Sequence, residues 1–194
     1  MDIERRAFTL DEISVEHRED MPPKVVGHAA VFNQLSEDLG GFREQITPGA
    51  FKEAIEEDDV RALFNHNPDF ILARNKAGTL RMKEDSKGLA IEFDPPDTQA
   101  GRDILVSLER GDVTQMSFAF SVKPNGQNFG EDDDGQIIRT LTDVRLFDVS
   151  PVVYPAYPQT DVAKRELRSF LDRNEPQEPD LTIYERELEL AERM

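Results

Sequence analysis

Residues 111–120 read Gly-Asp-Val-Thr-Gln-Met-Ser-Phe-Ala-Phe, and the interpretation of the whole chain depends on this stretch. The Gly-Asp pair is typical of a tight turn, and the residues after it alternate as in a β-strand. Every second residue from Met116 to Phe120 is apolar and lies on one face, so Ser117 lies on the other. A hydroxyl in an otherwise apolar strand either fills space or acts as a nucleophile.

The composition excludes several classes of protein. The 194 residues fit one domain with an appendage and are enough for a substantial core. Cysteine is absent, which rules out disulfides, thiolate catalysis and cysteine-bound metals and favours a reducing, intracellular setting. A formal charge of −17 argues against direct nucleic-acid binding, because neutralising phosphates takes clustered Lys and Arg. No apolar run is long enough to span a membrane, and the basic and then apolar order of a signal peptide is missing.

The order of elements predicts a mainly antiparallel β domain with a few helices. Residues 1–20 are expected to form an edge strand or a frayed arm, and residues 124–135 a polar loop. Further strands are expected at 25–32, 60–66, 79–83, 89–94 and 137–149, and helices after Thr47, at 99–110 and at 161–172. Asn67-Pro68-Asp69 is a strong turn signal, and residues 174–180 have the composition of a flexible linker.

The chain contains only three histidines, so candidates for a general base are few. His17 lies in a charged, exposed segment, and His28 lies inside a strand where a packing role is the default. His66 stands at the end of a strand, where an imidazole can reach a neighbouring strand. The three are scattered without the pair spacing of metal ligands, so we expect neither a metal site nor a cofactor.

Asp148 is the carboxylate in the least expected place, inside the apolar run Leu146 to Val149. A buried carboxylate needs a charged or hydrogen-bonding partner. An arginine such as Arg145 or Arg74, or water at the end of the strand, would satisfy it, and so would an imidazole that the acid orients. The residues alone leave both interpretations open.

Ser117, His66 and an acid are together the parts of a serine hydrolase. The hydroxyl is a weak nucleophile, so an imidazole has to take its proton, and an acid fixes the tautomer of that imidazole. The Gly-x-Ser-x-Gly elbow of α/β-hydrolases is absent, and so are phosphate-binding glycine motifs. The acidic run 131–134 lacks the alternating ligands of a calcium loop and is expected to be a solvated hairpin tip.

Several segments in this order resemble the prohead proteases of tailed bacteriophages, a family related to the herpesvirus capsid maturation proteases. The resemblance covers about residues 5–160. The segments that carry it are Gly27–Asn33, Ile46–Phe51, Leu63–Pro68, Gly78–Leu80, Asp97–Asp103, Gly111–Phe120 and Asp148–Tyr157. Departures are Ala119, where the family often has glycine, and His28, where it often has an aromatic residue.

The resemblance implies roles for three residues and a fold. Ser117 corresponds to the serine of the family's Met-Ser-Phe motif and would be the nucleophile. His66 corresponds to the histidine of Asn-His-Asp/Asn-Pro and would be the general base. Asp148 precedes Val-Ser-Pro and would be the orienting acid, a place where the family uses Asp or Glu and the herpesvirus relatives a second histidine. The implied fold is α+β, with a mainly antiparallel β-barrel core and surrounding helices, as in the herpesvirus enzymes.

The resemblance also implies a biological setting. The chain would be a serine endopeptidase that cleaves a scaffold protein, or the scaffold-like segment of the major capsid protein, and also itself. It would act in the host cytoplasm inside the assembling procapsid, with a homo-oligomer left open. The protease domain would span residues 1–160, with a helical extension at 161–194, and backbone N–H groups in residues 151–158 would form the oxyanion hole. The alternative is a non-catalytic or fused scaffolding protein that keeps the protease fold.

Overall fold

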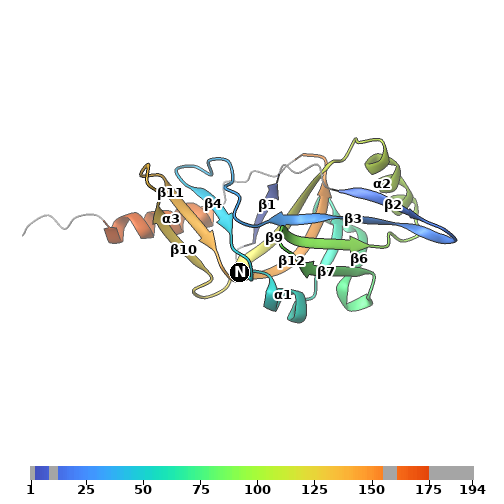
Figure 1. Cartoon of the computed structure of the whole chain (residues 1–194), viewed down its shortest axis with the longest axis horizontal. Coiled ribbons are helices and arrows are strands. Elements are labelled where there is room, and N and C mark those ends of the chain that lie inside the picture. Colours follow the sequence, from blue (N-terminus) through green and yellow to red (C-terminus); the bar gives the residue numbers. More distant parts are fainter. Residues whose placement is uncertain (1–2, 9–12, 155–160, 175–194) are drawn as a thin grey trace, which may run out of the picture.

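The computed structural model describes residues 3–8, 13–154 and 161–174 (Figure 1). The described part is mostly β-strand, with three α-helices, so the α+β class is confirmed. In chain order the elements are β1 (Glu4–Phe8), β2 (Ser14–Arg18), β3 (Met21–Val31), β4 (Arg43–Ile46), α1 (Lys52–Glu57), β5 (Arg61–Phe64), β6 (Asn67–Arg74), β7 (Leu80–Glu84), β8 (Gly88–Phe93), α2 (Gln99–Glu109), β9 (Gln115–Val122), β10 (Gln127–Glu131), β11 (Ile137–Leu141), β12 (Val144–Val152) and α3 (Asp161–Asn174), with a short 3₁₀ turn at Asn75–Ala77.

The described strands form three sheets. The five-stranded sheet has the order β1-β9-β12-β5-β6, and the other two have the orders β2-β3-β8-β7 and β10-β11-β4. Most pairs are antiparallel, as expected, whereas β12–β5 and β11–β4 are parallel. The hydrogen-bonded ladders do not close into a ring in the described part, so the predicted barrel is not confirmed.

The apolar face of β9 forms the centre of the core, as its alternation predicted. Phe118 and Phe120 are fully buried, and their rings stack with centroids 4.9 Å apart. Phe51, in the turn before α1, meets Phe118 edge-on at 5.5 Å. Burying a phenylalanine side chain contributes about 1.5–3 kcal/mol, so this cluster fixes β9 firmly. The opposite face of β9 is covered as well, because Ser117 is fully buried.

Helix α2 begins and ends where the sequence predicted. The Thr98 hydroxyl accepts a hydrogen bond from the Gly101 amide at 3.2 Å and caps the N-terminus. Gly111 follows the last turn with a φ of 77°, a left-handed conformation that suits glycine. The chain then enters β9 directly, so α2 sets where the serine strand starts.

Three local predictions were wrong. β6 begins at Asn67, because the hairpin turn lies two residues earlier than the Asn-Pro-Asp signal indicated. The predicted strand 137–149 is two strands, since the amides of Thr142 and Asp143 both donate to the Gly126 carbonyl and bend the chain between them. The predicted polar loop 124–135 contains β10. Polar strands such as β10 give little apolar alternation to detect.

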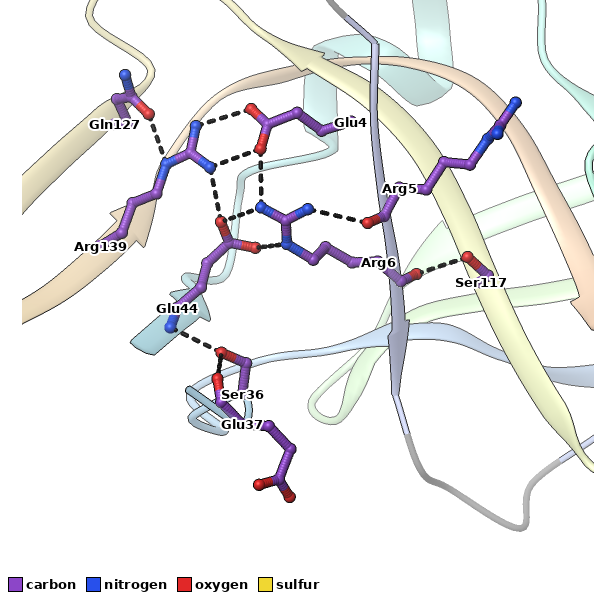
Figure 2. Close-up of polar contacts among 9 residues, drawn as sticks. All are labelled: Glu4, Arg5, Arg6, Ser36, Glu37, Glu44, Ser117, Gln127 and Arg139. Atoms are coloured by element: carbon purple, nitrogen blue, oxygen red, sulfur yellow. Dashed lines mark hydrogen bonds and ion pairs between the residues drawn. The ribbon is translucent and has the colours of Figure 1, made fainter. Parts of the chain in front are cut away.

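Four buried charges join β1 to the three-stranded sheet (Figure 2). Arg139 is fully buried and donates to Glu4 at 2.7 and 2.8 Å and to Glu44 at 2.8 Å. Arg6 also contacts Glu4 at 2.7 Å and Glu44 at 2.8 Å. Burial by itself would lower the pKa of Arg139, but its hydrogen bonds to the carboxylates and their charges outweigh this and raise it. Two positive and two negative groups cancel, and the cluster holds β1 against β4 and β11.

Helix α3 packs on a second, smaller core. Ala163 and Leu167 are buried against Leu39 and Phe42. Asn174, the first residue of the predicted linker, is the last residue of α3, and the rest of the linker and the tail beyond it lie outside the described residues. The division at residue 160 stays a prediction. None of the helices in the described ranges is long and apolar enough to cross a membrane.

Candidate active site

A tight hairpin turn between β5 and β6 presents His66. Phe64 and Asn67 pair across the turn, and the two residues between them, Asn65 and His66, have φ values of 54° and 55°. Positive φ at both central positions is the pattern of a type I′ turn. This conformation costs a non-glycine residue roughly 1–2 kcal/mol, although asparagine tolerates it best. A histidine held there needs support from its surroundings.

The end of β12 provides that support. The Asn65 amide donates to the Pro151 carbonyl at 3.0 Å, and the Asn65 side chain accepts from the Val153 amide at 2.9 Å. The His66 amide lies 3.3 Å from the Ser150 hydroxyl oxygen. These contacts attach the turn to β12 at three points, so the imidazole is positioned relative to that strand.

Ser117 and Asp148 come from the neighbouring strands β9 and β12. In the antiparallel register Ser150 lies opposite Ser117, and Asp148 lies opposite Ala119. Paired residues share a face of the sheet, and so do residues two apart on one strand. A bulge between Leu146 and Asp148 adjusts the register just before the acid. The serine and the acid therefore lie on one face, with β9 and β12 side by side.

The three candidate residues form a continuous hydrogen-bonded chain. The Nδ1 atom of His66 lies 2.6 Å from Asp148 Oδ1, and its Nε2 atom lies 2.7 Å from the Ser117 hydroxyl. Because a carboxylate only accepts hydrogen bonds, the proton of a neutral imidazole belongs on Nδ1, which leaves Nε2 free to accept from the serine. The arrangement can deprotonate the hydroxyl and stabilise the imidazolium that results.

Strand β1 closes this site. Ala7 pairs with Ser117 across the edge of the sheet, and the Arg6 carbonyl accepts from the Ser117 hydroxyl at 2.9 Å. The His66 side chain is only 5% exposed and Ser117 is not exposed at all. The serine has a single hydroxyl proton, so it donates either to Arg6 or to the imidazole at one time. In this conformation Ser117 is closed to solvent and β1 lies beside it.

The two arginines considered as partners of Asp148 bind other carboxylates. Arg145 lies near Asp58, and Arg74 binds Asp59 through two hydrogen bonds of 2.6 and 2.7 Å. The hydrogen bond from Arg74 lowers the pKa of Asp59 to about 2. In the described part of the chain neither arginine contacts Asp148, which is bound by His66 and Ser150.

The two other histidines face different carboxylates. His28 lies 3.0 Å from Asp85, and the exposed His17 lies 3.0 Å from Glu109. Within the described ranges no group of three or more His, Asp or Glu residues is arranged to hold a metal ion.

The predicted oxyanion donors can be placed only in part. Residues 155–160 lie outside the described residues. Of the preceding positions, Pro151 has no N–H, and the Val153 N–H is engaged by Asn65. The oxyanion hole therefore stays a prediction.

The sequence reasoning missed the two supporting residues, Ser150 and Asn65. Ser150 stands two positions after Asp148 on one strand, so the period of a strand already placed it on the acid's face. Asn65 precedes the candidate base and is of the type that accepts positive φ, although its partner on β12 is far away in the sequence.

A cavity of about 620 Å³ lies away from these residues, against β3, β7 and β8. Glu92 lies in its wall and bonds to Lys24 at 2.9 Å and to Arg81. The hydrogen bonds, first from Lys24 and then from Arg81, lower the pKa of Glu92 to about 2. Lys24, Arg81 and Glu92 in the wall of this cavity are thus paired with one another. None of them belongs to the Ser117 site.

Comparison with known families decides the class of protein. The family model described as caudovirus prohead serine protease matches residues 9–173. The chain belongs to this family. A caudovirus prohead serine protease is a serine protease of phage capsid maturation, associated with the prohead proteins and acting inside the assembling prohead.

Comparison with solved structures also found a similar chain. The bacteriophage T4 capsid assembly protease, gp21, aligns with a TM-score of 0.46 and 8% sequence identity, over 79% of this chain and 98% of that one. A likeness of this size adds no argument to the family match. No curated protein matches the chain, and the relation to the herpesvirus proteases stays a prediction.

Proposed function

We propose that this prohead protease cleaves peptide bonds with Ser117 as the nucleophile, His66 as the general base and Asp148 as the orienting acid. The Ser117 oxygen attacks the scissile carbonyl carbon while its proton passes to His66 Nε2. The imidazolium then gives this proton to the leaving amine, and an acyl-enzyme remains on Ser117. Water, deprotonated by the same imidazole, releases the acyl group and restores the serine.

One observation carries this proposal: the hydrogen-bonded chain from Asp148 through His66 to Ser117, with links of 2.6 and 2.7 Å. The acid touches the nitrogen that must keep its proton, and the serine touches the nitrogen that must accept one. The serine itself sits on a strand fixed by the aromatic core. Such preorganised geometry is what makes general base catalysis effective.

The proposed substrates are a scaffold protein or the scaffold-like segment of the major capsid protein, together with the enzyme itself. Strand β1 occupies the place beside the nucleophile, because the Arg6 carbonyl oxygen accepts a hydrogen bond from the Ser117 hydroxyl at 2.9 Å and Ala7 pairs with Ser117. We propose that β1 leaves the edge of β9 before the protein substrate binds, and that a substrate strand then takes its place.

The test is co-expression with the capsid and scaffold proteins of the same phage, followed by intact-mass analysis of every chain. Wild type is compared with Ser117→Ala and with Ser121→Ala, a control on the same buried face of β9. We expect wild type and the control to produce discrete fragments, and Ser117→Ala to leave all chains intact. Full-length chains in all three samples would overturn the proposal and favour a non-catalytic scaffolding role.

A further inference from the structure

A fourth side chain, Ser150, joins the two halves of the proposed site. Its hydroxyl donates to Asp148 Oδ1 at 2.7 Å, and its oxygen accepts from the His66 amide at 3.3 Å. Ser150 is fully buried and lies opposite Ser117 in the register of β9 and β12. One small residue thus touches both the acid and the backbone of the base.

The contact with Asp148 determines where the carboxylate points. Asp148 is buried, and its Oδ1 atom accepts hydrogen bonds from both the His66 imidazole and the Ser150 hydroxyl. With one donor removed, the carboxylate would lose a charge-assisted hydrogen bond in a site that water barely reaches. It could then rotate away from the line joining it to His66.

The contact with the His66 amide acts on the strained turn. His66 holds a φ of 55°, and its amide has the Ser150 hydroxyl as the partner on β12. A non-glycine residue in this conformation is kept there by surrounding contacts. Ser150 therefore couples the backbone of the base to the acid.

We propose that Ser150 is a positioning residue of this protease, which orients Asp148 and fixes the His66 turn without touching substrate. The proposal rests on the proposed function, because it assigns Ser150 a part in the same reaction. A serine kept only to fill space would be replaced by alanine without effect on the reaction.

The expected effect on rate follows from the kind of bond lost. A hydrogen bond to a charged group in a buried site is worth about 10- to 100-fold in rate when it acts on the transition state. Ser150→Ala should therefore lower kcat by about this factor and leave KM within about twofold. Ser150→Thr keeps the hydroxyl and should recover most of the loss.

The pH profile gives a readout that packing alone would not move. Arg5, Arg61 and Arg145 lie on the same face as Asp148 by strand register, and all three stay charged throughout the range of interest. Once the carboxylate is free to rotate away from His66, it stabilises the protonated imidazole less. The acid limb of the Ser150→Ala profile should then move to lower pH.

The experiment compares wild type, Ser150→Ala, Ser150→Thr and Ser121→Ala on the protein substrate that the wild type cuts, from pH 5 to 9. Melting curves are recorded alongside, and the hydrogen-bonded imidazole proton of His66 is followed by proton NMR. We expect the kcat loss, the shifted acid limb and a displaced imidazole proton signal in Ser150→Ala alone. The proposal is overturned if Ser150→Ala matches wild type in kcat, pH profile and proton signal. This outcome does not depend on whether Ser150→Thr folds.

The proton signal separates this proposal from the proposed function. If wild type cuts nothing but its imidazole signal moves on Ser150→Ala, the positioning contact stands and the catalytic proposal falls. If wild type cuts and Ser150→Ala matches it in every readout, the protease stands and the role of Ser150 falls.

Discussion

Replacing Arg139 by leucine should be among the most destabilising single changes in the described part of the chain. Arg139 is fully buried and contacts both Glu4 and Glu44, whose side chains are 1% and 2% exposed. After Arg139→Leu, Arg6 is the cation of this cluster that remains beside the two carboxylates. The variant removes one charge of a neutral set and leaves a net negative charge in a site closed to water.

The magnitude follows from the burial of these groups. Removing one partner of a buried ion pair costs about 3–5 kcal/mol, because the remaining charge is uncompensated. For a chain of this size 1 kcal/mol shifts Tm by about 2–4 °C, so Tm should fall by about 6–20 °C. The matched control is Arg81→Leu, which breaks two exposed pairs, since the Arg81 side chain is 40% exposed and its partners Glu92 and Asp94 are 36% and 34% exposed. Each such pair is worth about 0–1 kcal/mol, so the control should lose at most about 8 °C and less than Arg139→Leu.

The assay is thermal unfolding at pH 7 by calorimetry, with hydrogen exchange of residues 4–8 recorded on the same samples. Faster exchange in β1 should accompany the loss of Tm, because Arg139 holds Glu4 and with it the strand that covers Ser117. A Tm loss no larger than that of Arg81→Leu would refute the reasoning. It would show that the four charges do not depend on one another.

Two further predictions concern catalysis and acid stability. Asp148→Asn should lower kcat by about 10³- to 10⁴-fold, because the imidazole of His66 would no longer be held in the required tautomer. Steady-state kinetics measure this loss. An unchanged kcat would mean that another residue orients His66. Glu92 is bound by Lys24 and Arg81, and its pKa is lowered from 4.5 to about 2. A lowered carboxyl pKa stabilises the folded state above pH 4.5, and the contribution is lost as the pH falls through about 2. The Tm advantage of wild type over Glu92→Gln should therefore be full at about pH 6 and absent near pH 2, whereas an advantage that persists near pH 2 would contradict the assignment.

Local signals predicted the fold well where a single element carries its own pattern. Alternation placed Phe118 and Phe120 in the core and Ser117 on the other face, and Thr98 capped α2 as its position indicated. The start of β6 was missed because Asn-Pro-Asp is a strong turn signal, and the competing signal, an asparagine and a histidine with positive φ, is visible only in the backbone. The order of strands in the sheets depends on long-range pairing that local pattern does not encode.

The candidate site was predictable in its members and not in its assembly. Few histidines and one acid in an apolar run singled out His66 and Asp148, but the sequence left arginine partners open for the acid. The buried charges are harder still to predict, since Glu4 and Arg139 are 135 residues apart and no local pattern links them. Only folding brings such groups together, and the pairing then decides which of them are buried.

The most direct test of the central claim is covalent labelling of the nucleophile. An organophosphorus fluoride, which phosphonylates activated serines with loss of fluoride, is added to enzyme that has been shown to cut its substrate, and the adduct is located by peptide mass analysis. We predict a single adduct on Ser117, loss of cleavage in proportion to labelling, and very slow labelling in His66→Ala. Full cleavage activity with no adduct on Ser117, or an adduct on another serine that abolishes activity, would contradict the account.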